Sequence, residues 1–105
     1  MSSADEWLSV YQDDPSNELV CFTAAKALCD EKRLGEALPL LENVVKMQQD
    51  FALAYGMLGR VYLNLGRRDD ARVAAEKGLE LSLAQKHEVP EMEARAVLDE
   101  LDSEF

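Results

Sequence analysis

The stretch from Tyr55 to Leu81, YGMLGRVYLNLGRRDDARVAAEKGLEL, determines how this chain is expected to fold. Two apolar runs with helical spacing flank the break NLGRRDD, which predicts two helices joined by a short turn. Small residues occupy many positions where a helix would ordinarily carry large apolar side chains. We expect Gly59 and Ala75 to mark the place where the two helices cross closely, because a longer side chain there would push the backbones apart.

The rest of the sequence also predicts helices. Apolar residues recur with the spacing of one helix face from Ala37 to Val45, and again from Ala94 to Phe105. No run alternates apolar and polar residues as a half-buried strand would. Breaks between helices are expected at 13–17, 32–35, 48–50, 65–69 and 87–90. This predicts about six helices, the first of them short.

The charge is strongly acidic and unevenly spread. The chain has 21 acidic and 11 basic residues, a net charge of −10, which argues against nucleic-acid binding. Residues 1–17 carry four acids and no bases, and residues 86–105 carry seven acids and two bases, so two acidic ends flank a near-neutral middle. No window is apolar enough for a membrane span, and the first residues do not resemble a signal peptide.

The two cysteines, Cys21 and Cys29, would lie roughly 12 Å apart on one helix, too far for a disulfide. We expect both to be buried thiols in a reducing compartment, and therefore a cytoplasmic protein. The single histidine, His87, has no candidate partners for catalysis or zinc binding. The sequence thus predicts no catalytic residue, no metal site and no cofactor.

An internal period of 34 residues connects two parts of the chain. It places Leu19 on Leu53 and Lys26 on Arg60. At this period residues 52–85 resemble the tetratricopeptide repeat, a helix–turn–helix unit, and residues 18–51 resemble it more weakly. The residues that carry the resemblance in the second unit are Tyr55, Leu58, Gly59, Tyr62, Ala71, Ala75 and Gly78.

The resemblance implies an all-α fold, a tetratricopeptide-type stack of antiparallel helix hairpins closed by a C-terminal capping helix. We expect one domain over residues 1–105. Its parts would be a partial N-terminal helix (1–17), a first repeat (18–51), a second repeat (52–85) and the capping helix (86–105).

The same resemblance implies a non-catalytic scaffold that binds a partner protein or peptide in a concave groove lined by the first helix of each repeat. The groove residues are expected to be Leu19, Phe22, Lys26, Leu53, Met57, Arg60, Leu63 and Asn64. One alternative is that the closing helix covers this floor and that nearby acids such as Glu18 or Asp30 pair with the cations.

Another alternative is a self-associating structural module whose groove is occupied in its own oligomer. In a homodimer, the basic cluster formed by Arg67, Arg68 and Arg72 could meet the acidic end of a second copy.

Overall fold

The computed structural model describes residues 2–103 as a stack of six α-helices, without a strand in that range. The helices are α1 (Ser3–Asp13), α2 (Glu18–Asp30), α3 (Leu34–Met47), α4 (Ala52–Asn64), α5 (Arg68–Gln85) and α6 (Glu88–Ser103). The expected all-α stack of hairpins is confirmed. Phe105, assigned from the sequence to the last apolar stripe, lies outside the described residues.

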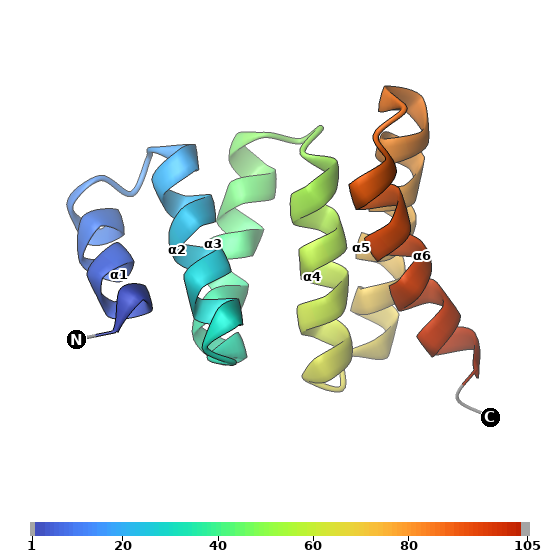
Figure 1. Ribbon diagram of the computed structural model, residues 1–105, viewed down its shortest axis with the longest axis horizontal. Coiled ribbons are helices and arrows are strands. Elements are labelled where there is room, and N and C mark those ends of the chain that lie inside the picture. Colours follow the sequence, from blue (N-terminus) through green and yellow to red (C-terminus); the bar gives the residue numbers. More distant parts are fainter. Residues whose placement is uncertain (1, 104–105) are drawn as a thin grey trace.

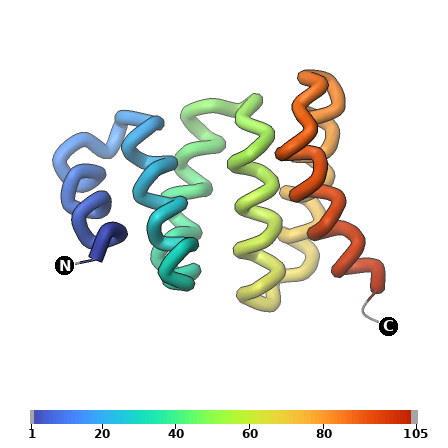
Figure 2. Tube along the Cα trace, in the orientation of Figure 1, coloured from blue at the N-terminus to red at the C-terminus, as the bar shows by residue number. Residues whose placement is uncertain are grey.

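The helices form two layers in an elongated molecule of 41 × 29 × 19 Å. Figures 1 and 2 show α2, α4 and α6 side by side in one layer, with α3 and α5 behind them and the two ends of the chain at opposite ends of the stack. Each helix packs on the next one along the chain, and α6 also packs on α4. Helices α4 and α5 begin 34 residues after α2 and α3, the period found in the sequence.

Equivalent turns close the two hairpins. Lys32, between α2 and α3, and Gly66, between α4 and α5, both have a left-handed backbone, with φ of 61° and 80°. In each turn the next residue donates its N–H to a carbonyl five residues back, Arg33 to Leu28 at 2.9 Å and Arg67 to Tyr62 at 2.8 Å. A lysine therefore occupies, in the first hairpin, a conformation that glycine adopts without strain in the second.

The helix starts follow local chemistry. Ser2 and Asn17 cap α1 and α2, because their side chains accept the backbone N–H three residues later. Pro90 lies in the first turn of α6, where its missing N–H leaves no bond unmade. Pro39 lies just past the first turn of α3. Because proline has no N–H, the carbonyl of Gly35 four residues earlier lacks its helical hydrogen bond, and Gly35 is exposed to water.

Small residues let α4 and α5 cross closely, as the sequence predicted. A Cβ built on Gly59 would lie 3.3 Å from the Ala75 Cβ and 3.3 Å from the Ala71 carbonyl oxygen. A Cβ on Gly78 would lie 3.2 Å from the backbone nitrogen of Gly56. The glycines therefore set the distance between the two helices, and Leu58 and Val61 fill the core beside them.

Helix α1 is fastened to the α2–α3 turn by what we call the Arg33 cluster, which is Arg33 with the carboxylates of Asp5, Glu31 and Glu36. Arg33 lies 2.8 Å from Asp5, 3.6 Å from Glu31 and 2.8 Å from Glu36. Glu31 also accepts the N–H of the buried Ala4 at 2.9 Å.

These bonds favour the charged carboxylates. The Arg33 guanidinium lowers the pKa of Asp5 and of Glu36, and the Ala4 N–H lowers the pKa of Glu31.

Helix α6 is fastened at its C-terminal end by the basic cluster. Arg72 pairs with Asp102 at 2.7 Å, and Arg68 donates to the Leu101 carbonyl at 3.0 Å. Arg67 pairs with Asp70 at 2.8 Å and lies over the Tyr62 ring. Within residues 2–103 the arginines of this cluster bond to their own chain, and the contact with the acidic end of a second copy stays a prediction.

The cysteines are both free thiols, and burial raises the pKa of each. Cys21 is fully buried as expected, whereas Cys29 is only half-buried because it faces a cavity described below.

Candidate functional site: the α2–α4–α6 groove

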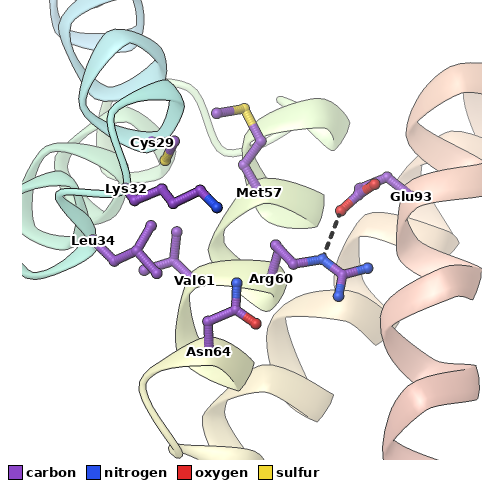
Figure 3. A pocket seen from close by; sticks show the side chains of 8 residues that line it. All are labelled: Cys29, Lys32, Leu34, Met57, Arg60, Val61, Asn64 and Glu93. Carbon is purple, nitrogen blue, oxygen red and sulfur yellow. Dashed lines mark hydrogen bonds and ion pairs between the residues drawn. The ribbon is translucent and has the colours of Figure 1, made fainter.

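Two adjoining hollows lie on the face of α4 that is turned away from α5. The α2–α4 cavity has a volume of about 300 Å³, and Figure 3 shows its lining. The α4–α6 cavity has a volume of about 590 Å³. Met57 and Glu93 line both hollows, so the two form one groove across three helices, which we call the α2–α4–α6 groove.

The floor of this groove is apolar. Leu53 and Met57 are half-buried in it, and α6 contributes Val89 and Met92, which are 64% and 69% exposed. Leu19, 34 residues before Leu53, is 71% exposed on α2. Large apolar side chains at this exposure that gather on one face of a protein indicate a surface for a partner.

Helix α6 forms the third wall of the groove and covers only the part of the expected floor around Leu63. It approaches α4 closely because a glycine faces it, and a Cβ on Gly56 would lie 3.3 Å from the Glu93 side chain. One side of α6, with Ala94, Val97 and Leu101, is buried against α4 and α5. Its exposed Val89 and Met92 continue the apolar floor, so α6 leaves the hollow around Leu53 and Met57 open.

Arg60 lines the α2–α4 cavity and pairs with α6. Its Nε lies 3.3 Å from Glu93, and its Nη1 bonds to Glu100 (Figure 3 marks the first contact). Burial alone would lower the pKa of Arg60, but the bonds to Glu100 and Glu93 outweigh it and raise the pKa. The acids that pair with Arg60 come from α6, whereas Asp30, one of the acids suggested from the sequence, pairs with the other predicted cation, Lys26.

Two polar side chains at the α2–α4 cavity differ from Arg60 in having no partner. The ammonium of Lys32 and the carboxamide of Asn64 make no hydrogen bond or ion pair with any residue in 2–103. By contrast Lys26, the predicted cation of the first repeat, lies 3.6 Å from Asp30 in an exposed pair.

Four of the eight predicted groove residues line the groove, namely Leu53, Met57, Arg60 and Asn64. Phe22 is half-buried with its ring centroid 4.7 Å from that of Phe51, and Leu19 and Lys26 are exposed on α2. The prediction for Leu63 needs correction. It is half-buried and packs against a cluster of α5 and α6 residues (Ala71, Ala75, Val97 and Leu101), outside both hollows.

Sequence reasoning missed several residues of the site, among them Val89, Met92 and Lys32. Val89 and Met92 were overlooked because the last helix was interpreted only as a cap, although they lie three residues apart on the side opposite Ala94 and Val97. Lys32 was overlooked because it lies in a turn, where side-chain direction depends on a backbone conformation that the sequence pattern does not reveal.

A further hollow of about 510 Å³ lies on the opposite face of α4, between α3 and α5. Val73 at its edge is 69% exposed, and Tyr62 donates its hydroxyl to Glu42 at 2.6 Å. Burial, followed by the bond to Glu42, raises the pKa of Tyr62 to about 12. Basic Lys46 and Lys77 and acidic Glu42 and Asp70 balance one another around it.

Comparison with known proteins connects this geometry to a family. A model of the tetratricopeptide repeat matches residues 28–82. A stretch of 67 residues is 36% identical to an Hsp70-Hsp90 organizing protein of Triticum aestivum, covering 64% of this chain and 12% of that protein. The chain thus spans about one eighth of the length of this relative.

Solved structures with the same fold include a tetratricopeptide repeat domain protein from Salinibacter ruber. It has a TM-score of 0.76 and 21% identity, over 85% of this chain and 99% of that one. A double mutant of MamA RS-1 has a TM-score of 0.71 and 20% identity, over 94% of this chain and 64% of that one.

Two other kinds of site are not found within residues 2–103. No group of His, Cys, Asp and Glu side chains there could hold a metal ion, and no helix there is long and apolar enough to cross a membrane.

Proposed function

Since this chain belongs to the tetratricopeptide repeat family, whose units are generally non-catalytic interaction modules, we propose that it is a scaffold whose α2–α4–α6 groove binds a segment of a partner protein. The observation that supports this most is the apolar floor that continues from α4 onto α6, with Met92 and Val89 left exposed. The relative from Triticum aestivum is named for organizing Hsp70 and Hsp90, which agrees with a scaffold role.

The floor suits apolar anchors of a peptide in a helical or extended conformation. Met57 and Met92 have unbranched, flexible side chains that can adjust to different anchors. A hydrophobic centre with polar groups at its rim is the arrangement in which a few anchors supply most of the binding energy. Arg60, Lys32 and Glu93 form such a rim here.

Replacing Met92 with Asp tests this proposal. Met92 and Val73 are both 69% exposed, but Val73 lies on the opposite face, so Val73→Asp is a matched control. We expect tagged wild type and Val73→Asp to retain the same proteins from a lysate of the native organism, and Met92→Asp to lose them. Circular dichroism should show the same helix content for all three proteins. If Met92→Asp retains the same proteins at the same yield, the groove is not the binding site.

Self-association through the same groove gives a different result. Light scattering at several concentrations would then detect a dimer that Met92→Asp dissociates and Val73→Asp does not. A monomer at all concentrations, with capture that depends on Met92, supports the binding of another protein.

A further inference from the structure

The hollow between α3 and α5 lies on the side of α4 opposite the groove. We call its lining the α3–α4–α5 face, and the residues that matter most in it are Glu42, Lys46, Leu58, Asp70, Val73 and Lys77. We propose that this face binds the same face of a second copy of the chain. The resulting symmetric dimer carries one α2–α4–α6 groove on each outer side, and the proposal does not depend on what the groove binds.

The acidic residues of this face gather near the C-terminal end of α4. Glu42 of α3 lies there, because it accepts the hydroxyl of Tyr62 at 2.6 Å. Asp70 of α5 lies at the same end, since it bonds at 2.8 Å to Arg67, and the Arg67 guanidinium lies over the Tyr62 ring.

The lysines of the face gather near the N-terminal end of α4. Helices α3 and α5 both run antiparallel to α4, so their later residues lie beside its first turns (Figure 1). Lys46 follows Glu42 by one turn of α3. Lys77 precedes Gly78, where a Cβ would lie 3.3 Å from the Tyr55 Cβ in the first turn of α4. One end of the face is therefore acidic and the other end is basic.

Apolar side chains lie between the two charged ends. Val73 lies between Asp70 and Lys77 along α5, and it is 69% exposed. Leu58, from the middle of α4, and Val45 of α3 line the hollow beside it. An exposed apolar side chain beside an apolar hollow indicates a surface for a partner.

This order makes the face complementary to itself. A two-fold axis that lies in the plane of the interface and crosses α4 at the level of Leu58 sets two faces together with their ends reversed. Glu42 of each copy then faces Lys46 of the other, and the two Val73 side chains meet near the axis. A two-fold axis parallel to α4 would set acid against acid, so charge selects the first arrangement.

Glu42 and Lys46 are both available for this pairing. Lys46 is exposed and makes no ion pair within residues 2–103. Glu42 uses its Oε2 for Tyr62, and no cation pairs with it in the same range. Asp70 and Lys77 each have an ion-pair partner in their own chain, so the contacts between Glu42 and Lys46 decide the arrangement.

The charge of the whole chain also favours a second copy at this face. The net charge is −10, so two copies repel each other in most orientations. Both ends of the chain are acidic, whereas the α3–α4–α5 face carries two lysines and two acids and is neutral. Complementarity to itself is what a two-fold interface requires, and it favours a second copy over a different protein.

Two opposite charge reversals on α3 test the inference. Glu42→Lys gives a face with lysine at both positions of α3, and Lys46→Glu gives a face with acid at both. Each variant alone sets like charges against each other across the interface. In a mixture of the two variants, the basic α3 of one copy faces the acidic α3 of the other, and the pairing is restored.

Sedimentation velocity at several concentrations measures the association. We expect wild type to dimerise, and each reversal alone to weaken the dimer roughly tenfold or more, because each substitution occurs twice in the interface. An equimolar mixture of the two variants should recover the dimer, which also shows that both are folded. Val73→Asp should lose the dimer, since it sets two carboxylates near the axis, but it keeps the groove and remains the control for partner capture.

Two controls lie outside the face. Lys26→Glu makes the same charge change as Lys46→Glu, but on α2. Met92→Asp alters the α2–α4–α6 groove and is matched to Val73→Asp in exposure. Both variants should dimerise as wild type does.

Other results would overturn the inference. Wild type that stays monomeric at its highest attainable concentration would exclude the dimer and leave the proposed function of the groove intact. Loss of the dimer in both reversals without recovery on mixing would contradict the pairing of Glu42 with Lys46, and equal loss in Lys26→Glu would reduce the effect to net charge. A dimer that Met92→Asp dissociates and Val73→Asp does not would assign self-association to the groove.

Discussion

The crossing of α4 and α5 at Gly59 makes a quantitative prediction about stability. A Cβ at this position would already lie 3.3 Å from the Ala71 carbonyl oxygen and 3.4 Å from the Ala75 backbone nitrogen. Both atoms belong to the backbone of α5 and cannot rotate away. Gly59→Leu adds three further carbons to a space that has no room for the first, so α5 must move or the leucine must leave its preferred rotamer.

Overpacking of this kind costs about 1–3 kcal/mol. Replacing glycine inside a helix also contributes a gain of about 1 kcal/mol, which offsets part of the cost. We expect Gly59→Leu to lower the free energy of unfolding by up to about 2 kcal/mol after this gain. For a domain of this length each kcal/mol corresponds to about 4–8 °C in Tm.

The matched control is Gly35→Leu. Gly35 is also helical, but nothing lies within 4 Å of a Cβ built on it, so the substitution changes helix propensity without crowding. We expect it to leave stability unchanged or slightly higher. Urea denaturation followed by circular dichroism gives the midpoint and slope for both variants. If Gly59→Leu and Gly35→Leu unfold at the same urea concentration, glycine does not set the helix crossing.

Three further predictions concern titration and reactivity. The carboxylates of the Arg33 cluster have lowered pKa values, so they stabilise the folded protein fully above pH 4.5, and this stabilisation is lost as the pH falls through the lowered values. The fluorescence of Trp7 on α1 should therefore change at a higher pH than the helix content does. The pKa of Tyr62 is raised from 10.0 to about 12, so stability should fall between these pH values, and Tyr62→Phe should abolish this loss in urea titrations. Of the two thiols, a thiol reagent should modify the half-buried Cys29 in the native protein, more slowly than a free cysteine, and a segment bound in the α2–α4 cavity should protect it.

The fold was largely predictable because its signals are local and periodic. Helical spacing, short breaks and a repeat of 34 residues are all visible in one dimension, and they place Gly59 opposite Ala75 without a structure. The crossing of α4 and α5 can be recognised in the sequence because only small residues, such as Gly59 and Ala75, fit where the two helices meet.

The site was only partly predictable because its composition depends on how α6 docks. The groove positions of the tetratricopeptide repeat, carried onto this chain, identified Leu53, Met57 and Arg60 as groove residues. The same positions also assigned Leu63 to the groove. Leu63 is instead covered by α6, which at the same time adds Met92 to the floor. Neither fact follows from the internal repeat, since α6 begins 36 residues after α4 and is not in register with it.

One wall of the groove is α6, the last described helix of the stack. Helix α4 packs against α3, α5 and α6, and α2 packs between α1 and α3, so these two walls are supported on several sides. Helix α6 packs on α4 and α5, and no described helix lies beyond it. Its polar bonds to the other helices come from Arg60, Arg68 and Arg72. The shape of the groove therefore depends on how α6 docks on α4 and α5, and a substitution in that interface alters the groove without touching α2.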